Sequence, residues 1–323
     1  MVTRQSKTIR TLRLVLPATS ANLGAAFDAA ALALSLYLRV SATSAETFSI
    51  TASGRDAEIC GAMQDHLILT TYQEILQSEH KPVVPLSLQI QNEIPIGKGC
   101  GSSAAARLSG IALANHFGHL RWPEERIIGE AAFREHHPDN AAACWMGGLA
   151  IARMSSARET QVVQITPKGK WPLLIAVPDA SLSTEQARRV LPQQYSRADV
   201  VTNIQNSMLL LAAFTRREPN LLKTALDDRV HQPYRATLCP LLPALQPRVG
   251  SNGIVGVALS GAGPSVLIFV DPKANLPATK LRLRRYLDEQ NLAAELMQTD
   301  ISKHGVRLSG SAADRHRAST RRP

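Results

Sequence analysis

The sequence predicts an α+β fold, in which strands and helices follow one another without the regular alternation of a doubly wound parallel sheet. Three observations lead to this prediction. Apolar residues alternate with a period of two in some segments, they recur at helical spacing in others, and the chain has no internal repeat. With 323 residues, 45% of them hydrophobic, and a mean hydropathy of −0.07, the chain can hold one large or two modest hydrophobic cores.

In the first half of the chain, period-two alternation predicts strands and helical periodicity predicts helices. Strands are expected at Leu12–Leu16, Leu32–Val40, Leu86–Ile90 and Leu149–Ala152, with Phe48 and Ile50 in a hairpin partner of the second. Helices are expected at Asp65–Leu76, from an N-cap at Ser102 or Ser103 through Phe117, and at Glu124–Arg134. The HHPDN segment then ends the helical pattern, because a proline disfavours helix at the residue before it.

In the second half, the same patterns predict strands at Leu173–Val177, Ile254–Leu259 and Val266–Val270, and helices at Val200–Phe214, Leu221–Arg229 and Lys280–Glu289. Because the pattern restarts after Trp171, we place a domain boundary between Thr166 and Trp171. The predicted organisation is a basic flexible leader (1–11), a first domain (12–168), a second domain (169–302) and a basic disordered tail (303–323).

The net charge of +10 does not indicate a nucleic-acid partner, because it is concentrated at the two ends of the chain. Residues 1–13 carry four Lys/Arg and no acid, and residues 303–323 carry six Lys/Arg and one Asp. We therefore expect solvated basic ends beside a nearly neutral core.

Neither a membrane span nor a secretory signal is expected. No apolar run reaches the roughly 18 residues of a span, and the basic N-terminus lacks the apolar segment of a signal peptide. The four cysteines are far apart and form no C-x-x-C pair, which argues against a disulfide framework and a metal cluster. These features predict a cytoplasmic protein.

The stretch Ile94–Arg107, IPIGKGCGSSAAAR, has the pattern of a phosphate-binding loop. It lies between a predicted strand and a predicted helix, and its three glycines permit tight bends and a close approach of a ligand. Such an arrangement presents free amide groups and the positive end of a helix dipole to an anion. It fits neither the Walker A pattern, because Lys98 lies among the glycines, nor the dinucleotide pattern. A plain turn is the alternative.

The sequence pattern of the loop, P-x-G-x-G-x-G-S-S-A, resembles the ATP loop of the GHMP small-molecule kinases. Two further segments resemble that superfamily in the same order, PATSANLGAAFD at 17–28 and SGAGPS at 260–265. Within the superfamily, the chain is most similar to homoserine kinases, through HPDN at 137–140, STEQAR at 183–188 and DDRVHQPYR at 227–235. The resemblance covers nearly the whole chain.

The resemblance implies a two-domain GHMP kinase fold. Its N-terminal domain would be similar to ribosomal protein S5 domain 2, its C-terminal domain would be ferredoxin-like, and ATP would lie between them. It also implies a homodimer that transfers the γ-phosphoryl group of ATP to the side-chain hydroxyl of L-homoserine, in threonine biosynthesis. The ATP-binding residues are then expected to be Pro95, Gly97, Lys98, Gly99, Gly101, Ser102, Ser103, Ser260, Gly261 and Gly263.

Homoserine is a zwitterion, so its site needs donors for a carboxylate and an acceptor for an ammonium group. Arg188 and Arg235 can each present a planar pair of donors to the carboxylate, and Asp28 can accept from the ammonium or the hydroxyl. The resemblance places the substrate among Asn22, Asp28, His137, Asn140, Thr184, Arg188 and Arg235.

Magnesium requires oxygen ligands, and we expect it at Ser102 or Ser103 with Glu130, with Glu135 as the alternative acid. The catalytic residues are expected to be Asn140, Asp28 and Asn22. An amide such as that of Asn140 cannot serve as a base, so we expect direct in-line attack with the proton passing late to a phosphate oxygen. Asp28 is the alternative base.

Two other functions fit part of the pattern. A GHMP kinase for an isoprenoid precursor or a sugar would not need the two arginines, and a non-catalytic GHMP-like binding protein would not need intact glycine loops. The chain also departs from the family's usual NLGPGFD, because Ala25 and Ala26 occupy its two middle positions. This departure bears on fine substrate preference.

Overall fold

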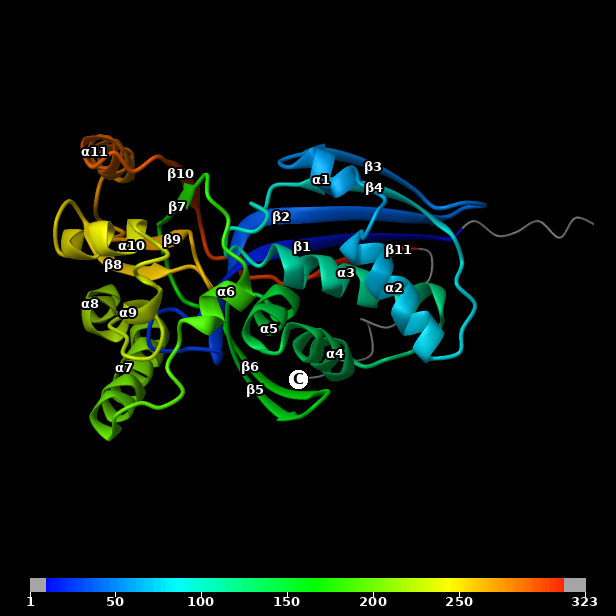
Figure 1. Ribbon diagram of the computed structural model, residues 1–323, viewed down its shortest axis with the longest axis horizontal. Helices are drawn as coiled ribbons and strands as arrows, with labels where there is room; N and C mark the ends of the chain where they lie inside the picture. Colours follow the sequence, from blue (N-terminus) through cyan, green and yellow to red (C-terminus); the bar gives the residue numbers. More distant parts are fainter. Residues whose placement is uncertain (1–9, 311–323) are drawn as a thin grey trace, which may run out of the picture.

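The computed structural model describes residues 10–310, which form two β-sheets that lie one beside the other along the long axis of the molecule (Figure 1). The larger sheet has seven strands and the smaller has four. Helices and strands mix without βαβ alternation, as the sequence predicts, and the α+β class is confirmed.

The larger sheet is organised around one long strand, β2. Its strands are β1 (Thr11–Ala21), β2 (Ala30–Ser44), β3 (Ser49–Gly54), β4 (Leu86–Asn92), β5 (Leu149–Ser156), β6 (Glu159–Ile165) and β11 (Arg307–Gly310). Along one edge β2 pairs with β1, and along the other it pairs first with β5 and then with β4. The order β11-β1-β2-β4-β3 results, and β6 extends the sheet beyond β5.

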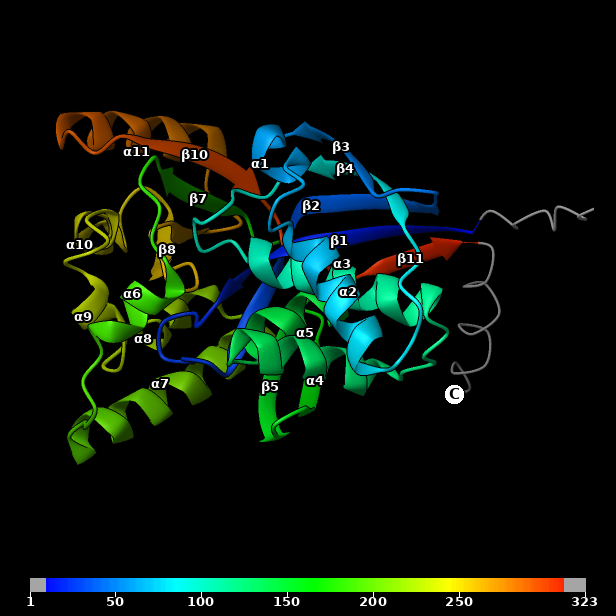
Figure 2. The ribbon, with the colours of Figure 1, turned by 45° about the vertical axis from the view of Figure 1, so that its right-hand side comes forward.

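Five helices accompany this sheet: α1 (Ala57–Gly61), α2 (Leu67–Ser78), α3 (Ser102–Phe117), α4 (Glu124–Glu135) and α5 (Asp139–Met146). Helix α3 contacts β1 and β2, and both α2 and α4 pack against it, with α2 in front of α3 in the view of Figure 2. Gly110 permits α2 and α3 to lie this close, because a β-carbon there would stand 2.6 Å from the carbonyl oxygen of Ile68. The buried face of α3 is rich in alanine, and the helix packs on β1 and β2. The phosphate loop, which ends where α3 begins, therefore lies beside the larger sheet.

The smaller sheet has the strands β7 (Leu173–Pro178), β8 (Ile254–Leu259), β9 (Val266–Val270) and β10 (Ala294–Thr299) in the antiparallel order β10-β7-β9-β8. Between β7 and β8 lie α6 (Thr184–Arg189), α7 (Arg197–Arg216), η1 (Pro219–Leu221), α8 (Leu222–Ala225), α9 (Gln232–Arg235), α10 (Leu241–Leu245) and η2 (Gln246–Arg248). Helix α11 (Leu276–Glu289) connects β9 to β10. This strand–helix–strand–strand–helix–strand sequence is the ferredoxin-like arrangement.

The chain crosses between the sheets twice. The first crossing lies between Ile165 and Leu173, where we predict the domain boundary. The second follows β10, where Ile301 bridges to Leu34 and the chain returns to the larger sheet. The last described strand, β11, pairs with β1 at the outer edge of that sheet.

Two predictions about pairing and order are wrong. The hairpin expected between the Phe48–Ile50 segment and Leu32–Val40 does not form, because β4 occupies that edge of β2 and β3 pairs in parallel with β4 instead. Residues 303–310, which we predict as part of a disordered tail, include β11. The leader and tail predictions for residues 1–9 and 311–323 lie outside the described residues.

Short elements are the other difference. The sequence patterns miss α1 (Ala57–Gly61), α5, α6, α9, α10, β6 and β10. The predicted helix Leu221–Arg229 ends at Ala225, because the carboxylate of Asp228 accepts the amide hydrogens of residues 230–232 and starts α9 instead. Within residues 10–310, no helix has the length and apolar character needed to cross a membrane.

Candidate active site

The phosphate loop bends at its three glycines, all of which have a positive φ: 70° at Gly97, 77° at Gly99 and 73° at Gly101. Gly101 caps α3, so Ser102 is the first helical residue, and the prediction of a serine N-cap is wrong. The amides of the first turn of α3 have no intrahelical acceptor. Ser102 and Ser103 line a cleft between the two sheets, so these amides are available to an anion there.

The second glycine loop, Ser260–Ser265, lies against the first. The hydroxyl of Ser260 donates to the carbonyl oxygen of Gly99 at 2.8 Å, and the amide of Ser265 donates to that of Lys98 at 3.3 Å. Gly261 and Gly263, which also have positive φ, line the same cleft. The two loops, about 160 residues apart in sequence, therefore form one continuous backbone surface.

The first motif connects β1 to β2 and is fastened to the second glycine loop by Asn22. The side-chain amide of Asn22 donates to the carbonyl oxygen of Gly261 at 2.8 Å, and its oxygen accepts from the amide of Asp28 at 2.9 Å. Asn22 and Asp28 both have positive φ, 71° and 53°. Asn22 thus shapes the turn that presents Asp28 to the cleft.

The HPDN segment begins in the turn after α4 and ends in the first turn of α5, which starts at Asp139. The Nδ1–H of His137 donates to Asp139 Oδ1 at 2.8 Å, and the main-chain amide of Asn140 donates to the same oxygen at 2.6 Å. Burial opposes protonation of His137, but the hydrogen bond and charge of Asp139 prevail and raise its pKa. The side-chain oxygen of Asn140 accepts from the hydroxyl of Thr19 at 2.6 Å, which orients the amide.

Asp28 and Arg188 form an ion pair across the cleft. The NH2 group of Arg188, on α6, lies 2.7 Å and 2.8 Å from the two carboxylate oxygens of Asp28. Burial and the nearby carboxylate of Asp139 raise the pKa of Asp28, and Arg188 opposes this rise. Thr184 stands one turn before Arg188 on α6, whose first turn is closed by a capping box between Ser183 and Gln186.

The second arginine of the site, Arg235, is 1% exposed. Its three hydrogen bonds go to neutral acceptors, the carbonyl oxygens of Ala187 and Gly261 and the Nδ1 of His231. Burial, followed by the charge of Arg188, lowers the pKa of Arg235 to about 10. The guanidinium carbons of both arginines lie 5.3–5.4 Å from the ring centre of Phe27, a cation–π distance.

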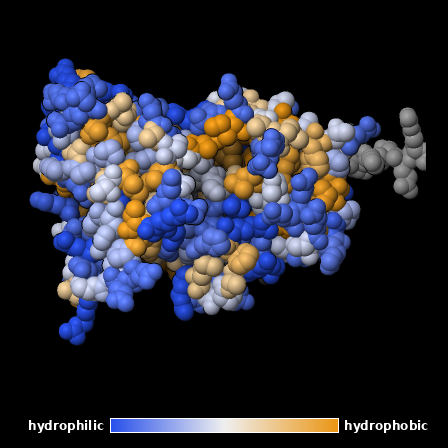
Figure 3. Space-filling view, viewed as in Figure 1, coloured by the Kyte–Doolittle hydropathy of each residue, from blue (hydrophilic) through white to orange (hydrophobic). Residues whose placement is uncertain are grey.

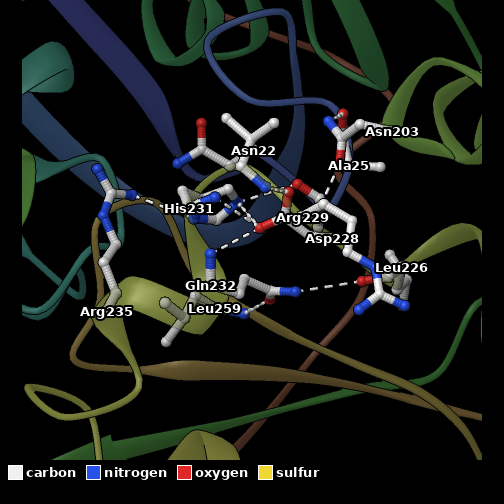
Figure 4. Close-up of polar contacts among 12 residues, drawn as sticks. Asn22, Ala25, Asn203, Leu226, Asp228, Arg229, His231, Gln232, Arg235 and Leu259 are labelled. Atoms are coloured by element: carbon white, nitrogen blue, oxygen red, sulfur yellow. Dashed lines mark hydrogen bonds and ion pairs between the residues drawn. The ribbon is translucent and has the colours of Figure 1, made fainter. Parts of the chain in front are cut away.

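A buried polar network behind Arg235 holds it in place (Figure 4). His231 receives a hydrogen bond from Arg235 on Nδ1 and donates from Nε2 to the carbonyl oxygen of Gly24, so it is neutral. Asp228 accepts three main-chain amides at the start of α9. Gln232 bonds to main-chain groups of Leu226 and Leu259, which fixes α9 to β8.

The two candidate metal-binding acids have different surroundings. Glu130 is 2% exposed, pairs with Arg134 at 2.9 Å and Arg158 at 3.4 Å, and does not line the cleft. Glu135 lines the cleft, and its Oε1 accepts from the hydroxyl of Ser103 at 2.7 Å. The same oxygen of Glu135 also accepts from Nε of Arg107 at 2.6 Å, so both acids are paired with arginine. Only Glu135 lines the cleft, which favours it over Glu130, and the assignment of the metal ligand stays a prediction.

An apolar pocket of about 350 Å³ opens beside the phosphate loop. Leu38, Ile59, Ile68 and Ile94 are among its walls, and it shares Gly97, Ser102 and Ser103 with the cleft. In the surface view, a hollow bordered by hydrophobic residues lies near α1, between the two halves of the molecule (Figure 3). The pocket can hold a flat apolar group attached to the anion.

Most of the predicted site residues meet in the cleft. Those that line it are Asn22, Asp28, Gly97, Gly99, Gly101, Ser102, Ser103, His137, Asn140, Thr184, Arg188, Arg235, Gly261 and Gly263. Four do not line it: Pro95 is buried, Ser260 lies beneath Gly99, the ammonium of Lys98 donates to the carbonyl of Asp179, and Glu130 faces away.

Sequence reasoning leaves several residues without a role. Asp139, Phe27 and His231 lie inside quoted motifs, and each touches a predicted site residue. Their position within the motifs is the signal that could have identified them. Thr19 also lies inside a quoted motif, but its contact with Asn140 arises only because β1 and α5 are adjacent in the fold.

This architecture is that of a small-molecule kinase of the GHMP type. It combines two sheets, a polar cleft between the two halves of the molecule, and two glycine loops in contact with each other at that cleft. Residues 66–148 match the family model of the GHMP kinases N terminal domain, and residues 210–289 match that of the GHMP kinases C terminal. The chain is 45% identical to the homoserine kinase of Solibacter usitatus over 80% of this chain and 84% of that protein. It is 32% identical to the homoserine kinase of Deinococcus radiodurans, over 90% and 94% respectively.

The chain belongs to the homoserine kinase family of the GHMP kinases. The fold agrees, because the crystal structure of homoserine kinase from Cytophaga hutchinsonii superimposes with a TM-score of 0.76. That alignment covers 93% of this chain and 97% of the other at 20% identity. The predicted GHMP kinase fold is thereby confirmed.

Proposed function

We propose that this chain is an ATP-dependent kinase that phosphorylates the side-chain hydroxyl of L-homoserine. One observation carries the proposal: the two arginines and Asp28 face the anion-binding glycine loops across a single cleft. Cationic and anionic groups beside one another match the carboxylate and ammonium of a small amino acid. A sugar has neither charge, and mevalonate has a carboxylate but no ammonium, so each would leave at least Asp28 unmatched.

ATP fits the cleft and the apolar pocket together. The triphosphate would lie against the amides of Gly99–Ser103 and the second glycine loop, at the N-terminus of α3. The adenine would enter the pocket walled by Leu38 and Ile68. The γ-phosphate would then lie on the side of the cleft that holds Asn140 and Asp28.

The reaction requires positioning more than a strong base. The hydroxyl oxygen attacks the γ-phosphorus while the bond from phosphorus to the β-γ bridging oxygen breaks, and the hydroxyl proton passes to an oxygen of the transferred group. The Thr19–Asn140 hydrogen bond leaves the NH2 of Asn140 for the reacting hydroxyl. Asp28 would accept hydrogen bonds from the ammonium of homoserine, and Arg188 and Arg235 would donate hydrogen bonds to its carboxylate.

The residues beside the loop also fit Mg²⁺. A serine hydroxyl 2.7 Å from a carboxylate supplies the oxygen ligands that this ion prefers, so Ser103 or Ser102 with Glu135 would hold it. Bound there, it would neutralise charge on the phosphate oxygens. The homodimer and the cytoplasmic location that we predict from the sequence stay predictions.

The test is a coupled assay of ADP release with L-homoserine, L-serine, mevalonate and galactose as acceptors. We expect turnover with homoserine to exceed that with each of the others. A higher kcat/KM for any other acceptor would reject the substrate assignment. Equal and negligible ADP release with all four would instead support the non-catalytic binding protein.

A further inference from the structure

The Asp28–Arg188 ion pair joins the two halves of the molecule. Asp28 lies in the loop between β1 and β2 of the larger sheet, and Arg188 lies on α6, which follows β7 of the smaller sheet. Both side chains are about one-third exposed, and both line the cleft where the substrate would bind. Two of the three charged groups that the proposed substrate needs, Asp28 and Arg188, are therefore already paired with each other.

Arg188 is incompletely satisfied in this arrangement. One nitrogen, NH2, contacts both oxygens of Asp28, while Nε is buried and has no hydrogen-bond partner within residues 10–310. A buried, unpartnered donor is costly. A guanidinium binds a carboxylate best through two nitrogens, so Asp28, which contacts only NH2, leaves Arg188 able to bind a second carboxylate more completely.

The charges around the pair are separated by sign. Arg235 is the second guanidinium at the Phe27 ring, and its hydrogen bonds reach no carboxylate. On the other side, an oxygen of Asp28, an oxygen of Asp139 and a ring nitrogen of His137 all lie within 4.8 Å of one another. One side of the cleft therefore lacks an anion, and the other brings two carboxylates close together.

We propose that the Asp28–Arg188 ion pair occupies the site in place of the amino acid, and that the substrate opens it by exchanging partners. The substrate carboxylate takes Arg188 together with Arg235, and the substrate ammonium takes Asp28. The number of ion pairs does not fall when both charges are present. This inference rests on the proposed function and adds to it the origin of selectivity for a zwitterion.

The exchange makes the two charges of the ligand interdependent. A molecule with a carboxylate alone frees Asp28 without a partner, and a molecule with an ammonium alone frees Arg188 without one. Leaving one member of a partly buried pair unmatched costs more than the pair itself contributes. Either single-charge analogue must therefore bind poorly, although it keeps one good contact.

The decisive experiment measures binding by calorimetry with a non-hydrolysable ATP analogue present. The ligands are L-homoserine, 4-hydroxybutanoate, which lacks the ammonium, and 3-amino-1-propanol, which lacks the carboxylate. In Asp28→Asn, Arg188 no longer has a competitor, so 4-hydroxybutanoate should bind about tenfold more tightly than to the unmodified enzyme, while homoserine binds more weakly. In Arg188→Met, 3-amino-1-propanol should gain affinity by a similar factor.

The matched control is Arg189→Met, on the neighbouring residue of α6. The side chain of Arg189 is 73% exposed, and it forms an ion pair with Glu185 on the same helix rather than with a residue of the cleft. All three ligands should bind this variant as they bind the unmodified enzyme. Thermal melting identifies a variant that fails to fold. If Asp28→Asn or Arg188→Met fails to fold, the binding measurements on the other of these two variants test the proposal.

A second measurement needs no variant. In the unmodified enzyme, exchange predicts that each single-charge analogue binds no better than 1-propanol, whereas independent subsites predict that the two charges contribute additively. Additive contributions, or unchanged or weaker binding of the matching analogue by a folded variant, overturn the proposal. Turnover of homoserine by the unmodified enzyme tests the proposed function separately, so the two failures are distinguishable.

Discussion

Gly99 of the phosphate loop lies directly on the carbonyl oxygen of Ser260 in the second glycine loop. A β-carbon on Gly99 would stand 2.1 Å from that oxygen and 2.7 Å from the carbonyl oxygen of Gly263. The two loops can therefore share one surface only if residue 99 has no side chain.

Gly99→Ala should separate the loops, raise the KM for ATP and lower the free energy of unfolding. Gly97→Ala is the matched control, because Gly97 has a similar positive φ but its nearest neighbour to a β-carbon is Ser181 Oγ at 3.5 Å. The left-handed backbone costs an alanine about 1–2 kcal/mol at either position. Steady-state kinetics and denaturant melts should show a further loss at position 99. Equal effects at both positions would contradict the packing of the loops.

Thr19 should matter to the reaction through Asn140. Thr19→Val removes the hydroxyl that orients the Asn140 amide, so we expect kcat to fall about tenfold with little change in the KM for ATP. Ser20→Ala is the control, because the hydroxyl of Ser20 is buried without a hydrogen-bond partner in the described part of the chain. It should leave kcat unchanged. If Thr19→Val had the same kcat as the control, the orientation of the Asn140 amide by Thr19 would not contribute to the reaction.

Glu135 and Glu130 should respond differently to loss of charge. Glu135→Gln should raise the Mg²⁺ concentration needed for half-maximal rate by at least about tenfold, because a charged ligand oxygen is lost. Glu130→Gln should leave the Mg²⁺ requirement unchanged and lower the stability by about 1–3 kcal/mol, because Arg134 and Arg158 lose their shared carboxylate. Magnesium titrations of the rate, with parallel melting curves, separate the two effects. The reverse pattern would restore Glu130 as the metal ligand.

His231 should make stability depend on pH below neutrality. Burial, together with the charge of Arg235, lowers its pKa to about 4, against about 6.5 in an unfolded chain. Between pH 6.5 and 4 the unfolded state therefore binds a proton that the folded state does not, and the free energy of unfolding decreases as the pH falls.

His231→Asn should be less stable than the unmodified protein at pH 8 but should lose stability less steeply on acidification. Denaturant midpoints at several pH values between 4.5 and 8 measure this slope. The exposed His80→Asn serves as the control, since asparagine tolerates its φ of 52°. A His231→Asn slope equal to that of the unmodified protein would show that His231 is not the titrating group.

The sequence by itself determined the motifs and the longer elements. Alternation along β2 and β4, and the glycine spacing at 97–101, are local properties that follow from side-chain period and backbone freedom. The two arginines were identifiable because each lies in a recognisable segment, STEQAR or DDRVHQPYR.

Only the tertiary structure decided which of these segments meet and how they pair. Strand β3 pairs with β4 rather than β2, and residues 307–310 return to β1, because pairing depends on which sheet edges are free in three dimensions. Glu135 and Glu130 lie five residues apart on the same helix, and only their neighbours distinguish them. The Asp28–Arg188 contact joins residues 160 positions apart, a separation across which no local pattern carries information.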